Sequence, residues 1–172
     1  RRPNRIGARE IYRIYLTENL PYAASVLEGT QTIGEAIDRL VNRLLDVQFA
    51  KTEQNKFLEI TLRSGRKENV YRSDLLSGAI IASVVERAKG MAIKRAITNL
   101  ADPNVATTDG ITEEDLQSAF NAEFSENDIF PPTDVAEDWF KLIDYDPENV
   151  VKIAPSRALA ATAAPQRTSG VI

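Results

Sequence analysis

The residue types in this chain restrict the chemistry that it can perform. Its 172 residues include no histidine and no cysteine, which excludes thiolate metal sites, Cys or His nucleophiles and a Ser-His-Asp triad. The acidic pairs Glu113-Glu114 and Glu137-Asp138 fall at expected helix starts and turns, where complementing a helix dipole or facing water is the simpler role. No Gly-x-x-x-x-Gly-Lys-Ser/Thr phosphate loop is present. A small enzyme is therefore the least favoured class.

One polar feature remains, at the start of a helix that we predict between Ser73 and Leu100. Ser77 can cap this helix, and Gly78 lets another group approach the backbone N–H groups of its first turn. Such a helix start suits a polar or anionic ligand, whereas an ordinary capped core helix is the simpler interpretation. Six apolar residues recur at helical spacing and predict the buried face: Ile81, Val84, Val85, Ala88, Ala92 and Ala96. Five charged residues are expected to fill the other face: Glu86, Arg87, Lys89, Lys94 and Arg95.

The composition restricts the partners. The net charge is -4 and the charged residues are mixed in sign, so we expect neither nucleic acid nor an anionic membrane as the main partner. No apolar run approaches the roughly 20 residues that a membrane helix needs. The absence of cysteine is compatible with a cytoplasmic location. The chain begins with Arg1-Arg2-Pro3, without an initiator Met or a signal peptide, so we expect it to be a piece of a longer protein.

The remaining elements are predicted from capping signals and from changes of hydrophobic period. Ala8, Ile11, Ile14 and Tyr15 share one helical face, and Thr32 with Glu35 forms a capping box ahead of a second helix. Alternating residues from Phe57 to Arg72, with a Ser64-Gly65 turn, predict a β-hairpin. Thr112 is expected to cap a short helix, and the segments 139–145 and 150–153 read as a second hairpin. Because a lone hairpin is only marginally stable, we expect both hairpins to join in one sheet, with Leu58, Ile60, Leu62 and Val70 buried against Trp139, Leu142, Val151 or Ile153.

Two segments, in this order, resemble the small C-terminal helical lid domain of AAA+ ATPases. They are REIYRIYLT (9–17) and LSGAII (76–81), the second being similar to the family's Ser/Thr-Gly-Ala helix start. In such ATPases these segments close over the adenine of the nucleotide. Residue by residue, the resemblance implies nucleotide contacts by Ile11, Ile14, Tyr15, Gly78 and Ala79. Ile80 stands where the family usually has an acidic residue, which removes a polar contact.

Further segments narrow the resemblance to the actinobacterial proteasome-associated ATPases, which include the mycobacterial proteasomal ATPase and the ring-forming relatives called ARC. They are NKFLEIT (55–61), NAEFSEN (121–127), Asp138-Trp139, and Tyr22 after a Thr-x-x-Leu-Pro segment. The likeness covers residues 3 to about 156. It implies an α+β chain: an AAA+ small α-helical lid domain over residues 1–54 and 73–128, with an inserted β-grasp-like small sheet formed by two hairpins over 55–72 and 133–154. A flexible C-terminal tail is expected over 155–172.

The resemblance also implies a function. The whole protein would be a homohexameric ring-forming AAA+ ATPase that unfolds protein clients with ATP, in some members for proteasomal degradation. Mg²⁺ would be bound by a large domain that these residues lack, so the chain alone should not hydrolyse ATP. Proteasome-docking members resemble Gly-Gln-Tyr-Leu at the C-terminus, whereas this chain has Val171 in place of the Tyr, so strong docking on a core proteasome is not expected. The alternative is a stand-alone ubiquitin-like or β-grasp binding module without ATPase activity.

Overall fold

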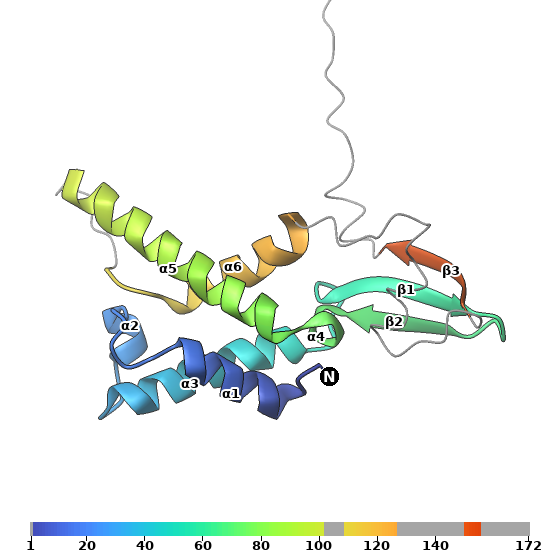
Figure 1. Cartoon of the computed structure of the whole chain (residues 1–172), viewed down its shortest axis with the longest axis horizontal. Coiled ribbons are helices and arrows are strands. Elements are labelled where there is room, and N and C mark those ends of the chain that lie inside the picture. The colour runs from blue at the N-terminus through green and yellow to red at the C-terminus, as the bar shows by residue number, and fades with distance from the viewer. Residues whose placement is uncertain (1, 102–108, 127–149, 156–172) are drawn as a thin grey trace, which may run out of the picture. The chain divides into compact units, whose positions relative to one another are not determined.

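The chain folds into two compact units, one of residues 1–50 and 75–129 and one of 51–74 and 130–172. The computed structural model describes residues 2–101, 109–126 and 150–155 (Figure 1). It combines helices with a small antiparallel sheet, which confirms the predicted α+β class. The boundaries expected for a lid domain and a β-grasp-like element stay predictions.

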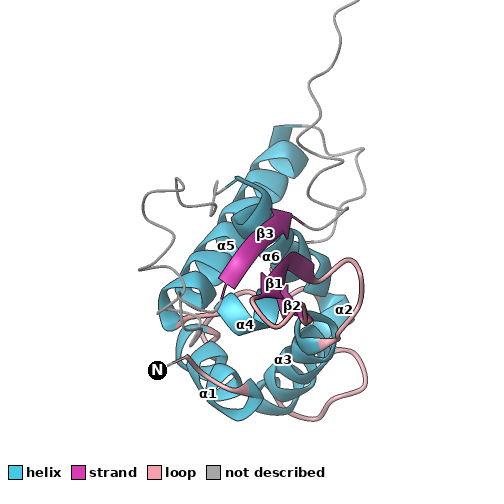
Figure 2. Ribbon diagram, turned by 90° about the vertical axis from the view of Figure 1, so that its right-hand side faces the viewer, coloured by secondary structure: helices cyan, strands magenta, loops and turns pink. Residues whose placement is uncertain are grey.

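The first unit is helical (Figures 1 and 2). It contains α1 (Arg5–Tyr15), α2 (Ala24–Leu27), α3 (Ile33–Phe49), α5 (Gly78–Ala101) and α6 (Glu113–Glu126). Helix α1 packs on α3 and on α5, and α6 packs on both α3 and α5. Their shared core includes five of the six apolar residues predicted for the buried face of α5, namely Ile81, Val84, Val85, Ala88 and Ala92. The sixth, Ala96, is only half-buried. The short α2 had no signal in the hydrophobic pattern.

The helix starts follow the predicted caps. The hydroxyl of Thr32 accepts from Glu35 N at 3.1 Å, but the Glu35 carboxylate accepts from Gln31 N, one residue before the expected Thr32 N–H. At α6 the capping box is reciprocal. Thr112 Oγ1 accepts from Asp115 N at 3.0 Å and Asp115 Oδ2 accepts from Thr112 N at 2.9 Å.

Two groups of polar side chains fasten α5 to α6. Arg95 donates two hydrogen bonds to Asp115, at 2.8 and 2.6 Å. Near the start of α5, Glu123 accepts from Ser83 at 2.8 Å and from Arg87 at 3.0 Å. Arg87 and Arg95 lie on the charged face of α5, opposite its apolar stripe, as predicted from the sequence. Each reaches α6, because α6 covers part of that face of α5.

Backbone hydrogen bonds join two distant segments of the helical unit at Tyr22 and Ile111. These residues form an isolated parallel bridge, with Ile111 N donating to Pro21 O at 2.8 Å and Ala23 N to Ile111 O at 3.0 Å. Gly110 has φ +87°, and a Cβ there would lie 2.6 Å from the carbonyl carbon of Tyr22. Only glycine fits this close approach.

The second unit contains a three-stranded sheet. The short α4 (Arg72–Leu75) follows the sheet's second strand in sequence, where the chain passes from this unit to the helical unit. Strand β1 (Lys56–Leu62) lies between β2 (Lys67–Tyr71) and β3 (Val150–Pro155), and both pairings are antiparallel. Ile60 pairs with Glu68 on one side and with Ile153 on the other. The first hairpin therefore does share a sheet with the strand from residue 150 onward, as predicted. The expected strand 139–145 and turn 146–149 lie outside the described residues.

Burial in the sheet follows the predicted alternation with two exceptions. Leu58, Ile60 and Val70 are buried, while Leu62 is only half-buried. Phe57 is buried as well, because a β-bulge between Lys56 and Leu58 inserts it as an extra residue. Val151 is largely exposed, so of the two β3 residues expected to pack on β1, only Ile153 is partly covered.

Candidate functional site

The start of α5 keeps two backbone donors open. Ser77 Oγ accepts from Ile80 N at 3.3 Å and the Ser77 carbonyl accepts from Ile81 N at 3.0 Å, so Ser77 is the predicted cap. Within the described part of the chain, the N–H groups of Gly78 and Ala79 have no hydrogen-bond acceptor. Unpaired donors at a helix start carry the positive end of the helix dipole.

Helix α1 passes directly beside this helix start. A Cβ built on Gly78 would lie 3.9 Å from Ile11 Cδ1, which is an ordinary contact distance. Ile14 and Tyr15 follow Ile11 by three and four residues, so they lie one turn further along the same side of α1. The structure thus brings Ile11 and Gly78 together, although they are far apart in sequence.

The exposure of α1 differs from the sequence interpretation. Ile14 is 68% exposed and Tyr15 37% exposed, whereas Tyr12, which was not predicted to matter, is completely buried. The buried stripe is Ala8, Tyr12 and Leu16, spaced by four residues, and that spacing could have identified it. Ile14 and Tyr15 are therefore left facing outward on α1, as is Ile6 near its start.

The buried Tyr12 is satisfied by one partner from α3. Its hydroxyl donates to Gln48 Oε1 at 3.2 Å or accepts from Gln48 Nε2 at 2.9 Å, and Gln48 is also fully buried. Burial raises the pKa of Tyr12 well above its ordinary value, and the hydrogen bond with Gln48 offsets part of this effect. The hydroxyl stays protonated and works as a structural link between α1 and α3.

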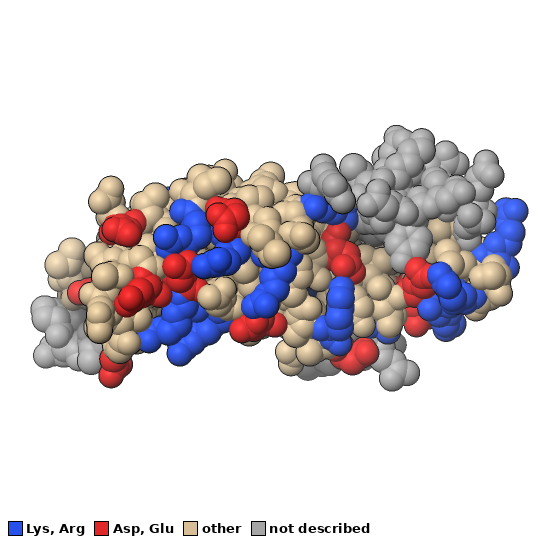
Figure 3. Space-filling view, turned by 90° about the horizontal axis from the view of Figure 1, so that it is seen from below, with Lys and Arg blue, Asp and Glu red and all other residues tan. Residues whose placement is uncertain are grey.

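A ladder of ion pairs joins the same two helices along their surface. Arg5 pairs with Asp46, Arg9 donates to Asp38 Oδ1 at 2.9 Å, and Arg13 lies 3.6 Å from the same oxygen. Charged side chains of both signs are interspersed on the face of the helical unit shown in Figure 3. The ladder therefore holds α1 on α3 at several successive turns.

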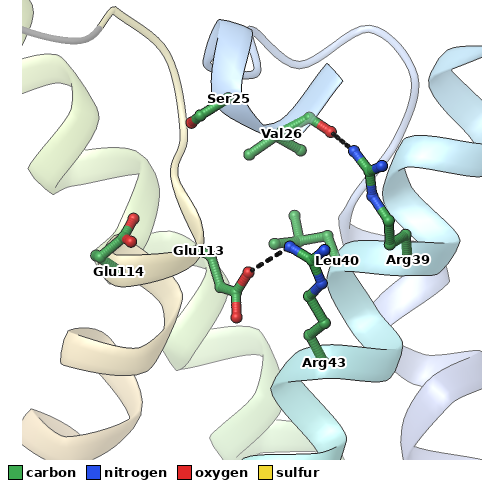
Figure 4. A pocket seen from close by; sticks show the side chains of 7 residues that line it. All are labelled: Ser25, Val26, Arg39, Leu40, Arg43, Glu113 and Glu114. Atoms are coloured by element: carbon green, nitrogen blue, oxygen red, sulfur yellow. Dashed lines mark hydrogen bonds and ion pairs between the residues drawn. The ribbon is translucent and has the colours of Figure 1, made fainter. Parts of the chain in front are cut away.

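Two cavities lie elsewhere in the helical unit. A polar one of about 140 Å³ lies between α2, α3 and the start of α6, where Arg43 pairs with Glu113 at 3.4 Å and Arg39 donates to Val26 O at 2.7 Å (Figure 4). Both arginines thus have a partner in the wall of this cavity. An apolar one of about 330 Å³ is lined by Leu20, Pro21, Ile93 and Ile111, among others.

Neither a metal centre nor a membrane span emerges from the described residues. Within residues 2–101, 109–126 and 150–155, no three acidic side chains gather closely enough to hold a metal ion. None of the helices in those ranges combines the length and the apolar content needed to cross a bilayer. What the α1–α5 site offers is an apolar wall beside two free backbone donors.

Comparison with known proteins assigns the chain to a family. The family described as "ARC, AAA+ ATPase lid domain" matches residues 3–170. The chain belongs to this lid-domain family. The predicted resemblance is thereby confirmed.

Curated relatives agree with this assignment. The chain is 34% identical over 152 residues to an "AAA ATPase forming ring-shaped complexes" of Corynebacterium kroppenstedtii, covering 88% of this chain and 26% of that protein. It is 38% identical over 153 residues to a "Proteasome-associated ATPase" of Sanguibacter keddieii, covering 88% of this chain and 25% of that protein. A ring-forming AAA ATPase of Kocuria rhizophila is 38% identical over 141 residues, 82% of this chain and 23% of its own length. The lid domain thus spans about a quarter of the length of the relatives that it matches.

Proposed function

We propose that this lid domain is part of a homohexameric AAA+ ATPase that uses ATP to unfold proteins, and that α1 and the start of α5 close over the adenine base. The observation that carries the proposal is the contact between Ile11 and Gly78, next to the outward-facing Ile14 and Tyr15. The family assignment supports it independently.

The chemistry of the site suits a nucleobase. Adenine has two apolar faces and a polar edge, so apolar side chains can cover a face while backbone groups meet the edge. Ile11, Ile14 and Tyr15 supply the wall, and the N–H groups of Gly78 and Ala79 supply donors. Mg²⁺ and the phosphates need acidic ligands and a Gly-rich loop, which we assign to another part of the full-length protein.

An apolar surface on α5 supports the assembly into a ring. Ile93, Ile97 and Leu100 are 59%, 61% and 84% exposed, and Ile93 borders the apolar cavity. Two nearby polar side chains have partners, since Lys89 pairs with Glu86 and Asn99 Nδ2 donates to Asp109. Ring closure requires each subunit to offer such a surface to a different surface of its neighbour. We propose that this patch contacts the adjacent subunit and passes on the nucleotide state that the other end of α5 senses.

Protein clients and a cytoplasmic location complete the proposal, the latter in keeping with a chain free of cysteine.

The test is Gly78→Val in the full-length protein, with Gly90→Val as the matched control in the same helix. Valine at 78 adds methyl groups beside Ile11, where the base would lie, whereas a Cβ at Gly90 meets nothing within 4 Å. We expect Gly78→Val to raise the KM for ATP roughly tenfold, a loss of about 1.4 kcal/mol, and Gly90→Val to leave it unchanged. Equal effects of the two variants would refute the assigned site. Walker A and B motifs encoded upstream of this segment are the cheaper check on the ATPase itself.

A further inference from the structure

The rotation of α1 about its own axis decides which side chains it presents. In the observed orientation Tyr12 points into the core while Ile14 and Tyr15 face outward. Side-chain ends lie roughly 5–6 Å from a helix axis, so a rotation of about 20° moves each of them by about 2 Å. Displacements of this size disturb a fitted binding wall. Something must therefore hold the rotation of α1 in place.

Asp38 of α3 is placed to do so. A single oxygen, Asp38 Oδ1, accepts from Arg9 at 2.9 Å and lies 3.6 Å from Arg13 Nη1. Arg9 and Arg13 are one helical turn apart, and Arg13 also donates to the Gly34 carbonyl at 3.1 Å, in the first turn of α3. One carboxylate thus restrains two successive turns of α1, at the level where Ile11 and Ile14 lie.

We propose that Asp38 is a positioning residue for base recognition: through Arg9 and Arg13 it sets the rotation of α1 and hence the position of Ile14 and Tyr15. This inference rests on the proposed function of the α1–α5 site. Asp38 itself lies on α3 and touches no part of the proposed base wall. Its effect should therefore appear in the recognition of the base and not in the chemistry at the phosphates.

The partial exposure of this cluster makes the idea testable. The side chains of Asp38, Arg9 and Arg13 are each between 33% and 41% exposed, and ion pairs of this kind add little to global stability. The buried link between Tyr12 and Gln48 remains to hold α1 on α3 when Asp38 is changed. A substitution at Asp38 should thus shift α1 without unfolding the unit.

The experiment compares ATP and GTP hydrolysis by the full-length protein carrying Asp38→Asn. We expect the KM for ATP to rise about three- to tenfold, while kcat stays within about twofold of its value in the unchanged protein. The ratio of kcat/KM for ATP over kcat/KM for GTP should fall by about the same factor as the KM rises. The matched control is Glu113→Gln, which removes the exposed pair between Arg43 of α3 and α6 without touching α1. The control should leave the ratio unchanged. Asp38→Glu keeps the negative charge and should restore the native ratio.

Each outcome decides the matter. An unchanged ATP/GTP ratio in Asp38→Asn, or an equal loss of activity with both nucleotides, would overturn the positioning role, the second result indicating general destabilisation. If Asp38→Asn does not fold, Asp38→Glu is compared with Tyr15→Ala instead. The positioning role would also be overturned if the ratio of kcat/KM for ATP over GTP fell as far in Asp38→Glu as in Tyr15→Ala. Should Gly78→Val and Tyr15→Ala both leave the KM for ATP unchanged, the proposed base site itself fails. That result is distinct from a failure of Asp38 alone.

Discussion

The ion pair between Arg95 and Asp115 should be the most sensitive polar contact of the helical unit, and Asp115→Ala tests this. The Asp115 side chain is 7% exposed and accepts two hydrogen bonds from Arg95 and one from Thr112 N. The substitution removes all three, while the hydrogen bond from the guanidinium to the Gly110 carbonyl, at 2.7 Å, is retained. It also removes the acidic half of the α6 capping box.

The magnitude follows from burial. Removing one partner of a buried ion pair costs about 3–5 kcal/mol. The Arg95 side chain is one quarter exposed, so water can reach it and the lower end applies. The lost cap contributes about 1 kcal/mol, and because the two effects share one side chain they add only in part. We expect a loss of about 3–4 kcal/mol, a large fraction of the roughly 5–15 kcal/mol that stabilises a typical domain.

The assay is urea denaturation followed by helical circular dichroism, with Glu114→Ala as the matched control. Glu114 lies beside Asp115 in the first turn of α6 but is exposed, so its removal should cost less than about 0.5 kcal/mol. A loss below about 1 kcal/mol in Asp115→Ala, or one equal to that of the control, would refute the reasoning.

The same pair predicts an acid response. Burial raises the pKa of Asp115, but the hydrogen bonds from Arg95 and Thr112 outweigh it and hold the pKa below its ordinary value. A carboxyl whose pKa is lower in the folded state than in the unfolded state stabilises the fold at pH values above the unfolded-state pKa of about 3.9. This stabilisation disappears as the pH falls through the folded-state pKa. The native chain should therefore lose stability more steeply below about pH 4 than Asp115→Ala does.

Two further predictions concern assembly and the sheet. Leu100→Glu in the full-length protein should shift the mass distribution from rings to smaller species, because it places a charge in the exposed apolar patch. Val47→Glu is the control: Val47 on α3 is also exposed but lies apart from the patch, so this variant should leave the rings intact. Rings of unchanged mass in Leu100→Glu would exclude the patch as a subunit contact. Deleting residues 150–172 removes β3 and should speed amide exchange in β1, which pairs with β3 along its length; exchange that is no faster would contradict this pairing.

Local signals determined most of the helices. Side-chain oxygens at Thr32, Ser77 and Thr112 sit three residues ahead of the N–H groups that they accept from, a relation that needs no tertiary context. Likewise the alternation from Phe57 onward, with a glycine at φ +82° in the turn, was enough to predict β1 and β2. The capped helix start pointed to Gly78 as a possible ligand position, but Ile11, Ile14, Tyr15 and Ala79 came only from family resemblance, because no pattern of period or spacing distinguishes them from ordinary core residues.

Tertiary structure decided the rest, because it depends on partners that are distant in the chain. The four-residue spacing of Ala8, Tyr12 and Leu16 is compatible with one buried side of α1, but the sequence offers Tyr15 on a competing side. The fold buries Tyr12, whose hydroxyl then needs the amide of Gln48 from α3 as its hydrogen-bond partner. Arg95 reads as a surface residue until α6 brings Asp115 to it. The close approach of Gly110 to Tyr22, and of Gly78 to Ile11, exists only once separate segments pack together. Sequence spacing records which residues share an element, whereas the packing of elements determines which residues meet.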